Sequence, residues 1–256
     1  MTKRDGSSLF SGRVRNYIKY RPTYPAALLD LLITRCRLGP DHVIADVGSG
    51  TGILTGMFLE HGNPVFAIEP NAEMRGAADE LLGRYPNFTS VDAGAEATGL
   101  RAQSVDFITA GQAFHWFDHP AARTEFIRIL KPGGWVVLVW NMARTNTAFE
   151  KEYNQFWRID LRGAHEAMDG HEALIRPFFG GAYYDHVVLD GVPQIMNEEQ
   201  FIGRILSVSA AIQPGEAGYD AFLRKARGIF ERHSQNDLVT LSYDTDVFLG
   251  QLVMKN

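Results

Sequence analysis

The most constraining feature of the sequence is the glycine-rich stretch at residues 46–52 (DVGSGTG), which closes the short apolar run at residues 43–47. Glycine tolerates positive φ and lets the backbone approach a ligand closely. The residues that follow have the pattern of a helix, and a helix N-terminus carries free N–H donors. The stretch therefore predicts a ligand-binding turn between a strand and a helix.

Further apolar runs follow at residues 64–69, 88–91, 105–110 and 135–140. Near-continuous runs of this kind are typical of strands buried on both faces, as in a parallel sheet. The segments between them carry helix signals, with Asn71 and Asp118 as N-cap candidates and Pro25 opening an earlier helix. This alternation predicts an α/β protein with a doubly wound, mostly parallel sheet that binds its ligand at the carboxyl ends of the strands.

The second half of the chain has a different pattern. Residues 147–180 are rich in aromatic side chains and predict helices, as do residues 198–210 and 219–233, whereas residues 183–189 and 247–253 predict strands. We expect one domain over residues 1–256, with a helical cap formed by about residues 1–24 and 146–233. The last strands then complete a seven-stranded sheet.

Charge and composition exclude several classes of function. A net charge of −5 and a pI of about 5.9 disfavour nucleic-acid binding, which depends on clustered Lys and Arg. The longest apolar run is far shorter than the roughly 20 residues of a membrane helix, and the first ten residues lack the apolar stretch of a signal peptide. The single cysteine, Cys36, excludes an intrachain disulfide and indicates a cytoplasmic protein. No histidine pair has metal-ligand spacing, so we expect no metal. The oligomeric state cannot be predicted from these features.

The glycine-rich stretch could bind a phosphate, a dinucleotide or another ligand. A phosphate-binding Walker loop would end in Gly-Lys-Ser/Thr, which is absent, and a dinucleotide fingerprint would place its third glycine where Ile53 stands. Asp46 precedes the first glycine by two positions. A carboxylate there suits a ligand with an ammonium group better than one with a pyrophosphate.

The stretch resembles the nucleotide loop of class I S-adenosylmethionine-dependent methyltransferases. The resemblance continues through Glu69, residues 94–97 (GAEA), residues 112–117 (QAFHWF) and residues 131–134 (KPGG), and it covers about residues 10–141. It is strongest for the small-molecule branch, including trans-aconitate methyltransferase-like proteins. The resemblance implies a Rossmann-like methyltransferase fold, S-adenosylmethionine as cofactor and S-adenosylhomocysteine as product. Relatives often carry Asp where Gly94 stands, so the adenine would depend on groups near Ala95 or on Glu96.

The resemblance also implies a set of site residues. Glu69 would accept hydrogen bonds from the ribose hydroxyls, by the logic that applies to NAD enzymes. Gln112 would hold the methionine end, and Arg21 would pair with the cofactor carboxylate or with an anionic substrate. The expected cofactor-binding residues are Tyr20, Arg21, Asp46, Gly48, Ser49, Gly50, Gly52, Glu69, Pro70, Ala95, Glu96 and Gln112.

His115 and Trp116 are the candidate catalytic residues. They follow the fourth strand, where they would border the reactive methyl group, and an aromatic face there could stabilise the sulfonium by about 0.5–2 kcal/mol. His115 is the only obvious general base. Structural readings stay open: His115 as a half-buried core histidine, Glu96 as an acid at a helix start, and Asp92 as an acid in a turn.

The function that these features favour is methyl transfer to a small molecule, with a carboxylate or a hydroxyl group as acceptor. An Asn/Asp-Pro-Pro-Tyr motif is absent after the fourth strand, which argues against methylation of adenine or glutamine nitrogen. Two alternatives remain: a module that binds S-adenosylmethionine without transferring the methyl group, and an NAD-dependent oxidoreductase. The acidic pI disfavours an RNA methyltransferase.

Overall fold

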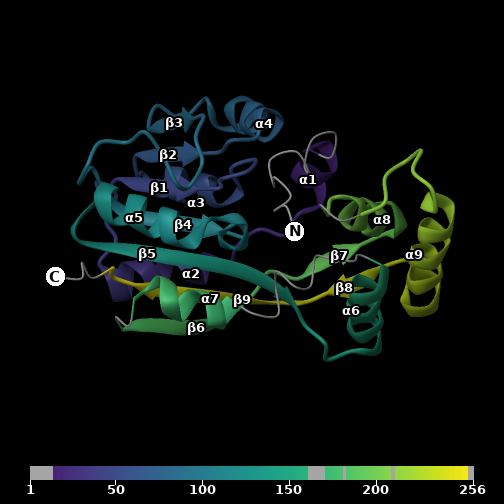
Figure 1. Ribbon diagram of the computed structural model, residues 1–256. Helices are drawn as coiled ribbons and strands as arrows, with labels where there is room; N and C mark the ends of the chain where they lie inside the picture. The colour runs from purple at the N-terminus through teal and green to yellow at the C-terminus, as the bar shows by residue number, and fades with distance from the viewer. Residues whose placement is uncertain (1–13, 161–170, 181–182, 209–210, 253–256) are drawn as a thin grey trace.

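The computed structural model describes residues 14–160, 171–180, 183–208 and 211–252. A seven-stranded sheet forms the centre, in the order β3-β2-β1-β4-β5-β9-β6 (Figure 1). Its strands are β1 Ile44–Val47, β2 Val65–Ile68, β3 Phe88–Val91, β4 Val105–Gly111, β5 Leu130–Ala143, β6 Tyr184–Asp190 and β9 Tyr243–Gly250. Strands β1 to β5 are parallel, and β9 is antiparallel to both of its neighbours. The strand order reverses between β1 and β4, which is where open α/β sheets bind ligands.

Helices cover both faces of the sheet. Helices α2 (Ala26–Cys36) and α3 (Ile53–His61) share one apolar core with the sheet. Helices α5 (His119–Ile129) and α7 (His171–Phe178) share a second core on the other face, which includes the fully buried Trp140. Helix α4 (Ala72–Leu82) follows β2. Because both faces are covered, β1 is buried along its whole length.

A cap with its own core lies beside the carboxyl ends of the parallel strands, and β5 leads into it (Figure 1). It contains the two-stranded sheet of β7 (Gln194–Met196) and β8 (Val239–Leu241). Its helices are α6 (Ala148–Asp160), α8 (Glu198–Leu206) and α9 (Tyr219–His233). Helix α1 (Val14–Tyr20) packs on α8, which places the N-terminal segment between the sheet and the cap.

The local predictions agree with the structure at most elements. The five apolar runs of the first half form β1 to β5, and residues 219–233 form α9. The Asn71 side chain accepts a hydrogen bond from the Met74 N–H (2.9 Å), and the Asp118 side chain accepts one from the Ala121 N–H (3.3 Å). Both residues therefore act as the predicted N-caps.

Two boundaries need correction. Strand β9 begins at Tyr243, ahead of the predicted residues 247–253, and pairs with β5 along its whole length. The predicted cap range 146–233 contains α7 and β6, which pack on and pair with the large sheet, while β8 of the cap lies outside that range. Periodicity identifies an amphipathic helix but says nothing about which core it covers.

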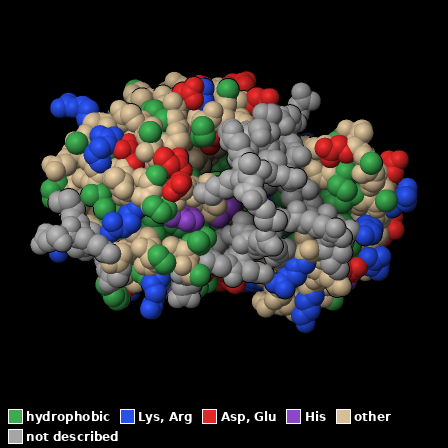
Figure 2. Space-filling model, viewed as in Figure 1, with side chains coloured by type: hydrophobic (Ala, Val, Ile, Leu, Met, Phe, Trp, Pro, Cys, Tyr) green, Lys and Arg blue, Asp and Glu red, His purple; other side chains and the backbone are tan. Residues whose placement is uncertain are grey.

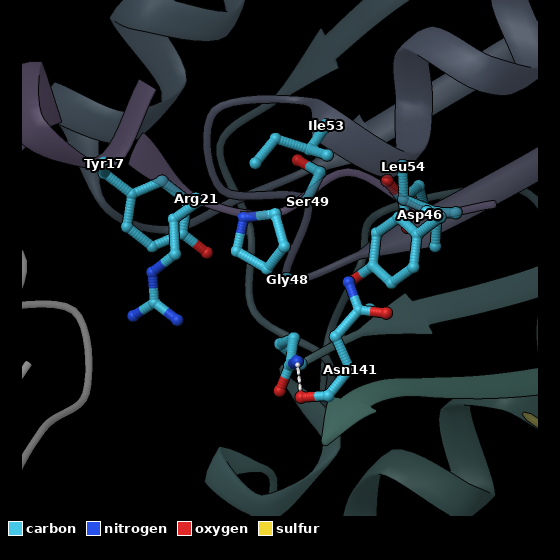
Figure 3. Close-up of a pocket in the computed structure, with 12 residues that line it drawn as sticks. Tyr17, Arg21, Asp46, Gly48, Ser49, Ile53, Leu54 and Asn141 are labelled. Atoms are coloured by element: carbon cyan, nitrogen blue, oxygen red, sulfur yellow. Dashed lines mark hydrogen bonds between the residues drawn. The ribbon is translucent and has the colours of Figure 1, made fainter. Parts of the chain in front are cut away.

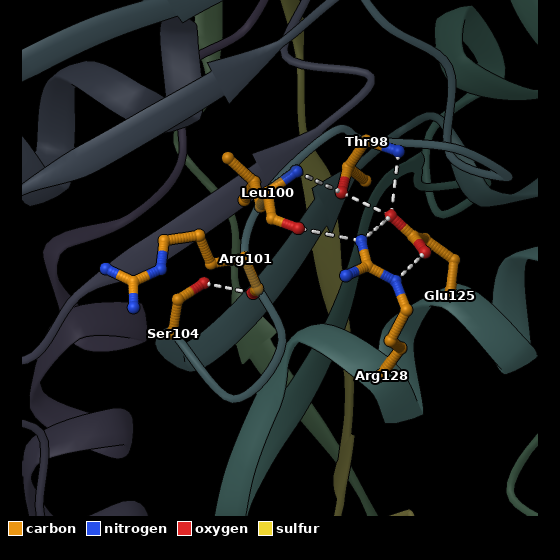
Figure 4. Close-up of polar contacts among 6 residues, drawn as sticks. All are labelled: Thr98, Leu100, Arg101, Ser104, Glu125 and Arg128. Carbon is orange, nitrogen blue, oxygen red and sulfur yellow. Dashed lines mark hydrogen bonds and ion pairs between the residues drawn. The ribbon is translucent and has the colours of Figure 1, made fainter.

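A polar network fixes the segment that follows β3 (Figure 4). Glu125 of α5 accepts hydrogen bonds from the N–H and the hydroxyl of Thr98 (2.8 and 2.5 Å) and pairs with Arg128 (2.6 Å). Arg128 also donates to the Leu100 carbonyl (2.8 Å). The Arg128 guanidinium, with help from Thr98, lowers the pKa of Glu125 to about 2. The network holds the turn after residues 94–97 against the body of the domain.

The surface carries charges of both signs. Figure 2 shows Lys and Arg side chains interspersed with Asp and Glu over the face that it draws. Within the described part of the chain, no helix is both long and apolar enough to span a bilayer, and no group of three acidic, cysteine or histidine side chains is arranged to hold a metal.

Candidate functional site

The glycine-rich turn connects β1 to α3 at the point where the strand order reverses. Gly48, Gly50 and Gly52 all adopt positive φ, at 68°, 58° and 85°. A Cβ atom on Gly48 would lie 2.5 Å from the Ala113 Cβ, and one on Gly52 would overlap the Leu82 side chain. Both conformation and space therefore require glycine at these two positions.

Asp46 lies inside β1, next to this turn, and is only 1% exposed. Its two carboxylate oxygens accept hydrogen bonds from the hydroxyls of Thr55 (2.6 Å) and Thr109 (2.9 Å). Burial raises the pKa of Asp46 to about 6, although the two hydroxyl donors and the Thr55 N–H oppose the shift. At neutral pH Asp46 is therefore a buried carboxylate with neutral partners, and it adjoins a cavity.

Glu69 follows β2 and is 8% exposed. Its Oε2 accepts a hydrogen bond from the Gly50 N–H (2.9 Å) and its Oε1 accepts one from the Asn71 N–H (2.8 Å). Burial raises the pKa of Glu69, and the two backbone donors oppose the shift. Glu69 therefore ties the end of β2 to the glycine-rich turn, and each oxygen keeps a lone pair for a further donor.

Two adjoining cavities open over this edge of the sheet. The outer cavity has a volume of about 260 Å³. Its lining consists of Tyr17, Gly48, Gly50, Glu69, Pro70, Met74, Gly94, Ala95, Glu96, Gly111, Gln112, Ala113, Trp116 and Phe117. The inner cavity is lined by Tyr17, Arg21, Pro22, Tyr24, Asp46, Gly48, Ser49, Ile53, Leu54, Gly111, Gln112 and Asn141 (Figure 3). Tyr17, Gly48, Gly111 and Gln112 line both, so the two cavities meet at the turn.

Polar groups in the turn are available to a ligand. Ser49 Oγ and Thr51 Oγ1 are buried and have no hydrogen-bond partner within the described residues. Gln112 adopts a left-handed φ of 57°, and its amide donates to the Asn141 carbonyl (3.0 Å). Since buried polar atoms are nearly always satisfied and Ser49 lines the inner cavity, its hydroxyl indicates a missing hydrogen-bonding partner there, whereas Thr51 lines neither cavity.

The structure gathers most of the residues predicted from the sequence. Around the two cavities lie Arg21, Asp46, Gly48, Ser49, Gly50, Glu69, Pro70, Ala95, Glu96, Gln112 and Trp116. Three predicted residues do not line either cavity. Gly52 caps α3, Tyr20 packs its ring against Gly203 of the cap, and His115 lies beside Trp116 with ring centroids 4.9 Å apart.

The two acidic residues with open readings have partners in the fold. Glu96 accepts a hydrogen bond from the Asp118 N–H (2.7 Å), so it braces the start of α5 while it lines the outer cavity. Asp92 is exposed and pairs with Arg75 (2.9 Å), which agrees with its reading as an acid in a turn.

The predicted site residues did not include Tyr17, Tyr24, Met74 or Asn141, all of which line a cavity. Tyr17 belongs to the same N-terminal aromatic segment as Tyr20, and only the orientation of α1 decides which of the two reaches the cavity. Asn141 stands directly after the apolar run at residues 135–140, near the end of β5. A polar residue at the carboxyl end of a parallel strand was a signal that could have found it.

The chain is similar in sequence and in fold to methyltransferases. Residues 45–138 match the family model described as a methyltransferase domain. An uncharacterized methyltransferase of Mycobacterium bovis is 34% identical over 154 residues, which is 60% of this chain and 60% of that protein. Malonyl-[acyl-carrier protein] O-methyltransferase of Marinomonas sp. is 30% identical over 138 residues, covering 53% of this chain and 51% of that protein. The solved structure of a candidate type II methyltransferase from Anaeromyxobacter dehalogenans superimposes with a TM-score of 0.67 at 23% identity, covering 91% of this chain and 99% of that one.

Residues 45–138 thus match a methyltransferase domain, and the strand order is that of the Rossmann-like methyltransferase fold. The match covers β1 to the middle of β5, and the sheet is completed by β9 and β6. The alignment with the Mycobacterium bovis relative spans 60% of that protein's length.

Proposed function

We propose that this protein transfers a methyl group from S-adenosylmethionine to a small-molecule acceptor, and that it belongs to the branch that includes trans-aconitate methyltransferase-like proteins. The observation that carries the proposal is the cavity enclosed by the glycine-rich turn, Glu69 and Gln112 at the switch point of the sheet. A relative that is an O-methyltransferase supports an oxygen acceptor, either a carboxylate or a hydroxyl.

The residues present fit the cofactor. The free lone pairs of Glu69 would accept the ribose hydroxyls, and Pro70, Ala95 and Glu96 would border the adenine. Gly48, Ser49 and Gln112 would hold the methionine end, with the buried Asp46 carboxylate close to its ammonium group. The unpartnered Ser49 hydroxyl supports this assignment because the ligand would supply its missing partner.

S-adenosylmethionine supplies an activated methyl group on a sulfonium that leaves as a neutral thioether. The residues of this chain therefore mainly have to hold acceptor, methyl carbon and sulfur in line and exclude water. Such orientation contributes up to about 7–11 kcal/mol in favourable cases. Trp116 offers a ring face at the outer cavity that can stabilise positive charge. A carboxylate acceptor needs no base, whereas a hydroxyl acceptor needs one, and His115 is our candidate.

Calorimetry with S-adenosylmethionine and S-adenosylhomocysteine tests the proposal, with NADH as the comparison ligand. We expect both sulfur compounds to bind and NADH not to bind. The absence of heat with S-adenosylhomocysteine at high micromolar concentration contradicts the proposal, and binding of NADH instead favours an oxidoreductase. A screen of acceptors with a methyl-labelled donor then separates a transferase from a module that only binds the cofactor.

A further inference from the structure

Four hydrogen-bond donors lie close together at the contact between α1 and the cap, and none has an acceptor within the described residues. The atoms are Arg21 Nε, Tyr153 Oη, Trp157 Nε1 and Arg204 Nη1, all of them buried. We refer to these four residues as the cap donor cluster. Arg204 is 5% exposed and Tyr153 is 1% exposed, so solvent does not replace the missing acceptors.

The members of the cap donor cluster come from three elements. Tyr153 and Trp157 lie one turn apart on α6, with ring centroids 6.0 Å apart, and the Arg204 guanidinium of α8 lies 5.8 Å from the Trp157 ring centroid. Arg21 follows α1 and donates to the Ser207 carbonyl at the end of α8 (3.4 Å). The cluster therefore joins the N-terminal segment to the cap.

The cluster carries two positive charges without a carboxylate. The ion pairs of the described residues involve neither Arg21 nor Arg204, and the one side-chain acceptor bonded to Arg204 is the Tyr243 hydroxyl (3.3 Å). That hydroxyl gives its own proton to Gln194 (2.7 Å). Burial lowers the pKa of Arg21, and the nearby Arg204 charge adds to the effect. Buried charges that lack a counter-ion are costly, so the arrangement indicates an anionic ligand.

We propose that the cap donor cluster binds a carboxylate group of the methyl acceptor, an inference that rests on the proposed function. The cluster lacks hydrogen-bond acceptors and a negative charge. A carboxylate supplies both, and its two oxygens match the planar donors of a guanidinium. Arg21 also lines the inner cavity beside Asp46 and Gly48, so an acceptor anchored here extends toward the glycine-rich turn. Tyr153, Trp157 and Arg204 line neither cofactor cavity, so three of the four donors lie outside the cofactor site and Arg21 borders it.

The experiment uses the full chain saturated with S-adenosylhomocysteine and titrated with succinate at constant ionic strength. Succinamide, which has a similar shape but no charge, is the control ligand. We expect succinate, and not succinamide, to bind and to raise the Tm. In Arg204→Gln we expect succinate affinity to fall at least tenfold while affinity for S-adenosylhomocysteine changes less than twofold. The matched control is Arg224→Gln, since Arg224 is exposed on α9 and should leave both affinities unchanged.

A second measurement separates ligand binding from a structural role. The ligand-free Arg204→Gln protein should have a Tm equal to or above that of the wild type, because a buried charge without a counter-ion is removed. Equal succinate binding by both proteins, or no succinate binding while S-adenosylhomocysteine binds, overturns the inference. A loss of S-adenosylhomocysteine affinity in Arg204→Gln assigns the cluster to the cofactor carboxylate and also overturns it. If the wild type does not bind S-adenosylhomocysteine, the proposed function itself fails.

Discussion

Two buried carboxylates, Asp46 and Glu69, occupy the ends of neighbouring strands but are held by different kinds of donor. Asp46 accepts hydrogen bonds from two side-chain hydroxyls as well as from the Thr55 N–H, whereas the donors to Glu69 within the described residues are two backbone N–H groups. Hydroxyl partners can rotate and reverse their hydrogen bonds, while backbone donors are fixed. The difference suggests a different consequence for each residue when its charge is removed.

For Glu69, we expect Glu69→Ala to weaken binding of S-adenosylhomocysteine at least tenfold, or about 1.4 kcal/mol. The carboxylate both positions the Gly50 N–H and faces the outer cavity. Calorimetry measures the change, with the exposed Glu80→Ala as control. Unchanged affinity in Glu69→Ala would show that the ribose lies elsewhere.

For Asp46, we expect a stability effect that depends on pH. Its folded-state pKa of about 6 lies above its ordinary value of 3.8, so the folded protein holds this proton more tightly than the unfolded chain. Its contribution to stability is therefore full below about pH 4 and is lost as the pH rises through about 6. Asp46→Asn does not lose this contribution. The difference in Tm between the variant and the wild type should therefore shift in favour of the variant from about pH 4 to pH 6 and stay constant above that range. Thermal melts across the range check this, with the exposed Asp41→Asn as control. A Tm difference that does not vary with pH would mean that Asp46 does not titrate as described.

His115 is half-buried next to Trp116, outside the lining of either cavity. We still expect His115→Ala to lower methyl-transfer turnover more than affinity for the cofactor, since the His115 ring contacts Trp116, which lines the outer cavity, while His115 itself does not. Turnover with an identified acceptor and calorimetry with S-adenosylhomocysteine give the two numbers. If affinity for S-adenosylhomocysteine falls while turnover per bound cofactor is unchanged, His115 helps to shape the cofactor cavity and does not act as a general base.

At the scale of helices and strands, the sequence predicts the features that depend on residues close together in the chain. Strands β1 to β5 and the N-caps Asn71 and Asp118 follow from apolar runs and capping residues, which act within a few positions along the chain. The glycine-rich turn and Glu69 also lie where the pattern puts them. Which face of α1 meets the cavity is decided by long-range contacts: the family resemblance implies Tyr20 at the site, whereas Tyr17 lines both cavities in the structure. The ring of Tyr20 packs instead against Gly203, about 180 positions further along the chain.

Two glycines near α4 should respond in opposite ways to alanine. We expect Gly52→Ala to destabilise the protein by about 1–3 kcal/mol, because Gly52 has a φ of 85° and its Cβ would meet Leu82. Gly76 lies in the middle of α4, where an added methyl group would have no neighbour within 4 Å, so Gly76→Ala should stabilise by about 0.5–1 kcal/mol. Urea unfolding with an unchanged slope measures both. Equal effects would mean that the turn tolerates a side chain.

At the scale of the whole molecule, the cap is the part that the sequence left least defined. Its core joins α6, α8, α9 and β8, elements separated by α7 and β6, which return to the large sheet. Contacts between such distant segments leave no periodic signal in the sequence. The predicted continuous range 146–233 therefore includes two elements of the large sheet and omits β8. The cap donor cluster depends on the same long-range contacts, because its residues come from three separate segments.

The contacts of α1 with both cavities and with the cap predict which segments cofactor binding should stabilise. Tyr17 of α1 lines both cavities, and α1 packs on α8 of the cap, with Tyr20 donating to Glu199 (3.0 Å). A ligand that fills the outer cavity should therefore slow amide hydrogen exchange in the glycine-rich turn, in α1 and in α8, since exchange there requires local opening that the ligand opposes. The paired strands β6 and β9, on the far side of β5 from the turn, should exchange at the same rate with and without ligand. Exchange followed by mass spectrometry, with and without S-adenosylhomocysteine, measures each segment. Protection of the turn alone would show that the cap is not coupled to the cofactor, and the acceptor would then have to be positioned without help from α1.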